Sequence, residues 1–159
     1  VIYEAALNEY APLGIEAAVT NTATVSGTGI TPVTAAETVN AEAAPNLAIT
    51  KSVSPVPVTE NGTLTYTFRI QNYGSVAATN TTGVVITDTF APVLNNLTAA
   101  LNGTAWTAAT DYTYNEATGT FSSTAGAITV PAATYTQDST TGAWVVTPGE
   151  STLVITGTV

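Results

Sequence analysis

Three polar residues with the chemistry to react with one another fall on the apolar faces of predicted strands. The only lysine of the chain, Lys51, alternates with Leu47, Ile49 and Val53, which places it on their face of the strand. The same count places Asp88 with Val84, Ile86 and Phe90, and Asn21 with Val19, Ala23 and Val25. An ammonium, a carboxylate and a carboxamide are therefore expected to point inward, each from a different strand.

Two kinds of contact among these three residues are open. In the first, Lys51 and Asp88 form a buried ion pair with Asn21 as a hydrogen-bonding neighbour, or one of them sits at a strand end and reaches water. In the second, the Lys51 amine attacks the Asn21 carboxamide and forms an isopeptide bond, with Asp88 assisting and ammonia leaving. Burial would favour both the neutral amine and a protonated Asp88 that polarises the amide carbonyl. We expect some direct contact among the three and lean toward the isopeptide bond.

Conventional enzyme chemistry has few residues to use. The chain contains no His and no Cys, so the commonest general base, metal ligand and thiol nucleophile are missing. Asp111 and Glu116 could pair for glycoside chemistry, although a small sandwich offers no evident cleft. Together with Asp138 they lack the dense spacing of a calcium loop. The sequence therefore predicts no enzyme beyond an autocatalytic crosslink, and neither cofactor nor metal.

Two further groups of residues could serve binding or modification. The aromatic side chains of Trp106, Tyr112, Tyr114, Tyr135 and Trp144 could form a platform for stacking sugars, although core and cross-strand packing is the interpretation that we favour. Sequons for N-glycosylation occur in predicted turns or strand edges at Asn61, Asn80, Asn96 and Asn102.

Composition excludes other classes of function. The formal charge of -9 arises from 11 acidic residues against Lys51 and Arg69, so the chain has no basic patch for nucleic acid. No apolar run approaches the roughly 20 residues that cross a bilayer, so we expect no membrane insertion by this segment. Because the sequence begins with Val1, we expect any export signal or anchor to lie outside it.

Period-two alternation is the main structural pattern. It is clearest at 63–70, where Leu64, Tyr66, Phe68 and Ile70 share one face and turn residues stand on both sides. Many short strands separated by turns indicate an antiparallel β-sandwich. We predict strands at 17–25, 31–40, 47–53, 63–70, 83–90, 97–101, 111–115, 119–122, 127–130, 143–147 and 151–159.

The chain divides into an arm, residues 1–45, and a body, residues 46–159. The stretch 40–46 has no apolar face, and we interpret it as the junction between the arm and the body. The alternating pattern of the arm is long enough for two or three strands, but the arm has too few apolar residues to form a core of its own. We therefore expect the arm to need a partner surface.

Four motifs of the body resemble the DUF11 repeat domain of prokaryotic surface proteins. They are, in order, LAITKSVSP at 47–55, NGTLTYTF at 61–68, QNYG at 71–74 and VITDTF at 85–90. The resemblance implies an immunoglobulin-like sandwich, in tandem arrays of secreted or wall-attached proteins, and hence a place at the cell surface. It also implies an Asn-Thr-Ala-Thr motif in the last strands of the domain.

In this chain that motif, Asn21 to Thr24, precedes the domain instead of closing it. The arm therefore looks like the closing strands of a neighbouring copy, and the body like a sandwich without its own. The chain could be one repeat unit of a tandem array, with its ends shifted relative to the domain, or it could donate its arm to the next subunit of a polymer. The arm could also fold back onto its own body.

These observations predict a structural module of an extracellular filament, a pilus-like fibre or an adhesin stalk. Copies would join head to tail by strand complementation, with other copies of the chain as partners, and a Lys51–Asn21 bond could lock them. The alternative is a carbohydrate- or host-binding adhesin domain, which would need an exposed aromatic patch.

Overall fold

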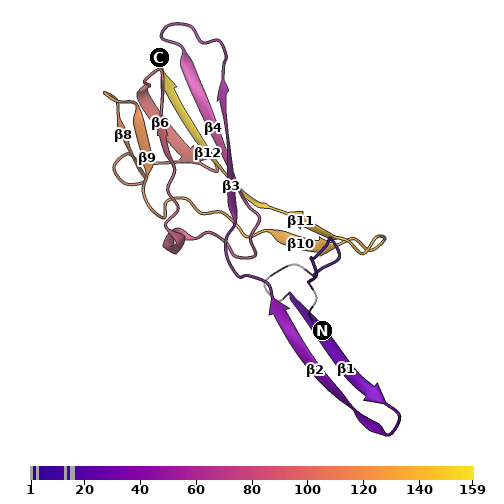
Figure 1. The fold of residues 1–159 in the computed structure, drawn as a ribbon. Coiled ribbons are helices and arrows are strands. Elements are labelled where there is room, and N and C mark those ends of the chain that lie inside the picture. The colour runs from indigo at the N-terminus through magenta and orange to yellow at the C-terminus, as the bar shows by residue number, and fades with distance from the viewer. Residues whose placement is uncertain (1, 3, 13, 15–16) are drawn as a thin grey trace.

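The computed structural model describes residues 2, 4–12, 14 and 17–159, and it confirms the all-β prediction (Figure 1). Within these ranges the helical structure is one 3-10 turn, η1 (Asn80–Thr82). The strands are β1 (Ala18–Gly27), β2 (Ile30–Asn40), β3 (Leu47–Ser54), β4 (Thr63–Asn72), β5 (Thr87–Thr89), β6 (Asn95–Leu101), β7 (Thr104–Ala105), β8 (Tyr112–Asn115), β9 (Thr120–Ser123), β10 (Thr134–Gln137), β11 (Trp144–Thr147) and β12 (Gly149–Thr158).

The body is built like a β-sandwich. A five-stranded sheet in the order β3-β4-β12-β6-β7 and a three-stranded sheet in the order β5-β9-β8 enclose one core, while β10 and β11 form a separate hairpin. The pairings within both sheets are antiparallel. Fully buried side chains come from both sheets, among them Phe121 of β9 and Leu153 and Ile155 of β12.

Strand β4 shows why the alternation at 63–70 folds as it does. It lies between β3 and β12, and its buried apolar residues are Leu64, Tyr66, Phe68 and Ile70, the set that the sequence places on one face. Residues directly opposite on neighbouring strands share a face, so Phe68 faces inward between Lys51 of β3 and Leu153 of β12.

Strands β1 and β2 form a long hairpin that projects from the body (Figure 1). Its turn includes Gly29, whose φ of 76° lies in the region that favours glycine. Val19 is half-buried, and every other residue of the two strands is exposed. The segment before β1 does touch the body, because the Trp144 N–H donates a 2.7 Å hydrogen bond to the Glu9 carbonyl. The β1–β2 hairpin thus projects from a segment that is hydrogen-bonded to the β10–β11 hairpin.

A buried asparagine that the sequence reading missed connects the junction to the body. Asn72 at the end of β4 is fully buried, and its Oδ1 accepts 2.9 Å hydrogen bonds from the N–H groups of Asn46 and Gly74. Its Nδ2 donates to the carbonyls of Val76 at 2.8 Å and Pro131 at 3.0 Å. Both ends of this side chain are satisfied, so Asn72 fixes the point where the chain enters the body.

Most predicted strands are present within one to two residues, but two predictions were wrong. The stretch 83–90 is a strand only at Thr87–Thr89, because its partner β9 spans only Thr120–Ser123 and the ladder can be no longer than that strand. The stretch 127–130 contributes an isolated bridge between Val130 and Ala78 instead of a strand. The short strands β7 and β10 were not predicted.

Candidate functional site

Two open sheet edges meet on the same side of the body. Strand β3 is the end of the five-stranded sheet, and β5 is the end of the three-stranded sheet. Edge strands carry unpaired backbone N–H and C=O groups that can accept another strand. Because β3 has eight residues, its edge is long enough to pair with another full-length strand.

Between these edges lies an apolar hollow of about 180 Å³, here called the edge groove. Two inward-alternating residues of β3 that border it, Leu47 and Ile49, are 37% and 53% exposed, and Val53 farther along the strand is 38% exposed. The side chain of Val85, from the segment before β5, is also exposed. The residues lining the groove are Leu47, Ala48, Ile49, Ile70, Val84, Val85 and Ile86.

The structure brings Lys51 and Asp88 together across the gap between the two edges. The Lys51 Nζ forms an ion pair with Asp88 Oδ2, which joins β3 of one sheet to β5 of the other. The Lys51 side chain is 40% exposed and that of Asp88 is 18% exposed, so the pair is only partly buried. The other carboxylate oxygen, Oδ1, accepts a 2.8 Å hydrogen bond from the Thr89 N–H.

Aromatic rings of the core surround the ammonium of Lys51. Its Nζ lies 4.8 Å from the ring centroid of Tyr66, 5.5 Å from that of Phe68 and 5.3 Å from that of Phe90. Each distance is within the range of a cation–π contact. Lys51 therefore points toward the core rings although its side chain is 40% exposed.

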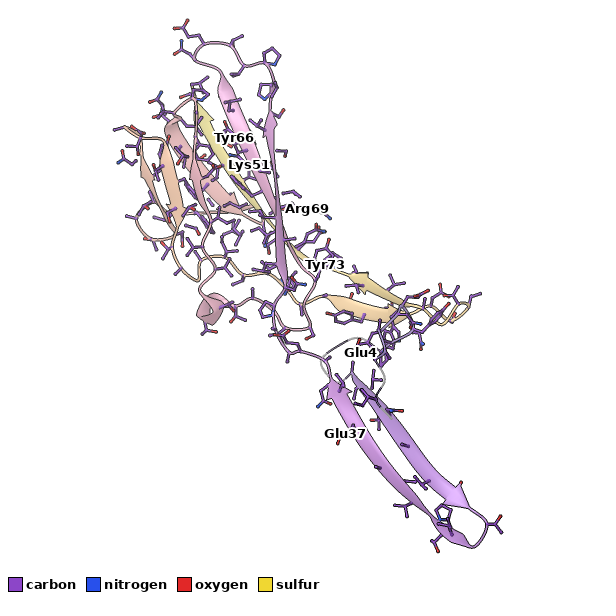
Figure 2. The ribbon with its side chains drawn as sticks, viewed as in Figure 1. Glu4, Glu37, Lys51, Tyr66, Arg69 and Tyr73 are labelled. Atoms are coloured by element: carbon purple, nitrogen blue, oxygen red, sulfur yellow. The ribbon has the colours of Figure 1, made fainter. Side chains whose placement is uncertain are left out.

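Asn21, the third residue of the predicted site, is on the projecting hairpin. It lies directly opposite Glu37 of β2, and Figure 2 shows Glu37 on the hairpin and Lys51 on the body. Glu37 was not considered as a site residue from the sequence. It could have been found by pairing the predicted strands around the turn at 28–29, because that register places Glu37 opposite Asn21.

The hairpin has one apolar and one polar face, and apart from the half-buried Val19 both are exposed. Residues paired directly across the two strands share a face. The pairs Val19–Val39, Ala23–Ala35 and Val25–Val33 form the apolar face, with Asn21–Glu37 between them. On the other face, Thr20 and Thr38 join their hydroxyls at 2.8 Å, and Thr24 lies opposite Thr34.

The other acidic candidates serve turns. The Asp111 carboxylate accepts the Thr107 N–H at 2.8 Å. Hydrogen bonds from the backbone N–H groups of Thr141 and Thr140 hold the pKa of Asp138 below its ordinary value. Glu116 lies in the turn between β8 and β9. Among the described residues, no group of three or more His, Cys, Asp or Glu side chains is placed to hold a metal ion.

The five aromatic candidates do not make one platform. Tyr112 is buried and stacks on Phe121 with ring centroids 5.3 Å apart, while Trp106 and Tyr114 are partly buried against the core. Tyr135 and Trp144 belong to the separate β10–β11 hairpin. Packing therefore accounts for the first three.

All four predicted glycosylation sites are exposed. Asn61 and Asn102 lie in turns with a positive φ, Asn96 has a positive φ near the start of β6, and Asn80 begins η1. The side chain of Asn102 is already engaged, because its Nδ2 donates to Ser151 Oγ at 3.2 Å and its Oδ1 accepts the Thr152 N–H at 2.8 Å. A glycan on Asn102 would be attached to the same Nδ2 atom that donates to Ser151.

Comparison with models of protein families, with curated proteins and with solved structures gives no match for this chain. Across the described ranges, the structure holds no helix with the length and apolar character needed to span a membrane.

Proposed function

We propose that this chain is a structural module of an extracellular filament, a pilus-like fibre or an adhesin stalk. Copies join head to tail when the β1–β2 hairpin of one copy closes the sandwich of the next. The observation that carries this proposal is the coexistence of an uncovered edge groove in the body and an uncovered valine face on the hairpin.

The strand order supports the hairpin as the missing part of the sandwich. In an immunoglobulin-like domain, one sheet has the order A-B-E-D and the other contains C, F and G. The order β3-β4-β12-β6 corresponds to the first sheet, and β5 takes the place of strand C. A two-stranded hairpin would supply F and G, with β1 next to β5 and β2 closing toward β3.

Burial gives this docking a driving force. Each valine of the apolar face would contribute about 1.5–3 kcal/mol if it were fully buried. Strand addition would also pair the backbone groups of the open β5 edge, which otherwise favour uncontrolled association. An isolated two-stranded hairpin is at best marginally stable in water, so docking would stabilise the donor as well as the acceptor.

The proposal extends to a covalent lock at the joint. Asn21 lies on the hairpin and Lys51 on the body, so a bond between them would link two copies. The Lys51 amine would attack Cγ of Asn21 after giving a proton to Asp88, the C–N bond of the carboxamide would break, and ammonia would leave. Lys51 already contacts Asp88, the residue assigned to this proton transfer.

Sedimentation velocity on the full chain tests the assembly. Replacing Val25 and Val33, which face each other, by threonine keeps their shape but makes the docking face polar. We expect this variant to remain monomeric at concentrations at which the unmodified chain assembles. The matched control replaces Thr24 and Thr34 of the opposite face by valine and should still assemble. Equal assembly of both variants would contradict the proposal.

A further inference from the structure

We propose that Glu37 of an incoming hairpin contacts Lys51 of the acceptor copy, so that the pairs Asn21–Glu37 and Lys51–Asp88 together set the register of docking. This inference rests on the proposed function, and it assigns a specificity role to Glu37. The occupant of the edge groove is then the hairpin of a second copy.

The donor side presents one polar pair in an apolar surface. Glu37 and Asn21 lie directly opposite each other, between Val19–Val39 and Ala23–Ala35. A carboxylate that enters an apolar interface loses hydration, so it needs a cation at the place where it arrives.

The acceptor side offers that cation. The chain has two basic residues, and the structure pairs Arg69 with Glu150. Lys51 is the other, and it lies at the gap between β3 and β5 with part of its side chain still exposed. Its ammonium has three N–H donors, so it can keep Asp88 and still reach a second carboxylate.

Only one register satisfies both surfaces. A slip by one residue would turn the threonine face of the hairpin toward the core. A slip by two residues keeps the apolar face inward but places Ala23–Ala35 or Val19–Val39 at Lys51, and it moves Glu37 against apolar side chains. The polar pairs thus discriminate between registers that burial alone would treat alike.

A charge exchange between copies tests this contact. The Glu37→Lys variant would bring two ammonium groups together, and Lys51→Glu would gather three carboxylates, so each variant alone should self-associate at least about tenfold more weakly than the unmodified chain. In an equimolar mixture, the Glu37→Lys hairpin fits the Lys51→Glu body, and the reverse joint has its original charges. We expect mixing to restore assembly in sedimentation velocity.

The matched control is Glu60→Lys, which makes the same change of charge in the exposed turn before β4. Mixed with Lys51→Glu, it should not restore assembly. A double-mutant cycle with neutral variants keeps the test valid if Lys51→Glu fails to fold. Glu37→Gln and Lys51→Gln each remove the same contact, so the double variant should weaken association no more than either single variant.

The outcomes separate the two proposals. If the unmodified chain assembles but neither rescue nor coupling is found, the Glu37–Lys51 contact is wrong and hairpin exchange stands. If the unmodified chain remains monomeric at every concentration tested, head-to-tail assembly fails and this inference fails with it.

Discussion

The β1–β2 hairpin and strand β4 have the same kind of sequence and opposite surroundings. Both alternate apolar and polar residues with period two. In β4 the apolar residues are buried, because β3 and β12 flank the strand and a second sheet covers it. In the hairpin the corresponding valines are exposed: Val25 is 68% exposed and Val33 is 65% exposed.

This difference shows what alternation does and does not determine. It determines that a segment is a strand and which residues share a face, since successive side chains point to opposite sides. It does not supply the layer that covers that face. Among the described residues, neither the valines of the hairpin nor Leu47 and Ile49 at the edge groove are covered by a second layer.

The largest expected effect comes from deleting the arm, residues 1–45. No hairpin would then be available to cover the groove of any copy, so the edges of β3 and β5 would stay open. We expect the truncated body to be insoluble, as measured by the protein left in the supernatant after centrifugation. A truncated body that stays soluble, folded and monomeric would show that the edges need no cover.

Alanine substitutions compare the two regions directly. Phe121 is fully buried, so Phe121→Ala should lower the free energy of unfolding by about 3–5 kcal/mol. Val25→Ala should change it by less than about 0.5 kcal/mol in the monomer, because this side chain is exposed there. Urea denaturation at concentrations below assembly measures both values. A large loss for Val25→Ala would mean that the hairpin packs on its own body.

The covalent lock predicts a change of mass. Digestion of assembled protein should yield a peptide pair joined through Lys51 and Asn21 and lighter by about 17 Da, the mass of the ammonia that leaves. Asp88→Ala should abolish this pair, whereas Asp111→Ala, which removes a turn carboxylate, should not. Spectra of assembled protein with only unmodified Lys51 would leave the ion pair as the sole link.

Without the covalent lock, Asp88→Ala tests the ion pair alone. Because Lys51 is 40% exposed, solvent screens the pair, and we expect a loss of about 1 kcal/mol or less in the free energy of unfolding of the monomer. Asp111→Ala serves again as the control for removing one carboxylate. A loss of several kcal/mol would show that the aromatic surroundings shield the pair from water.

The smallest expected effect concerns pH and the core. Burial raises the pKa of Tyr112, because the phenolate would be poorly solvated. The folded state therefore holds this proton above pH 10, where an unfolded tyrosine releases it, and stability should fall as the pH rises through that range. Tyr112→Phe should reduce this alkaline loss. Identical pH profiles of unfolding for the two proteins would contradict the prediction.

Part of the candidate site could be predicted from sequence because it depends on local periodicity. Counting alternate residues placed Lys51 and Asp88 on inward faces, and the structure pairs them. Counting along one strand could not reveal Glu37 as the neighbour of Asn21, because that relation depends on the register between β1 and β2. The sequence also overestimated the strand at 83–90, since the length of its ladder depends on a distant partner, β9, which spans only Thr120–Ser123.

The sequence by itself determined the all-β class, most of the strands and the inward direction of Lys51 and Asp88. All of these follow from side chains that alternate along an extended backbone. Only the tertiary structure decided that β3 and β5 end their sheets side by side, that Lys51 bridges them, and that the groove between them is uncovered. The order of strands in a sheet arises from contacts between distant segments, and no period within one segment encodes which edge is left open.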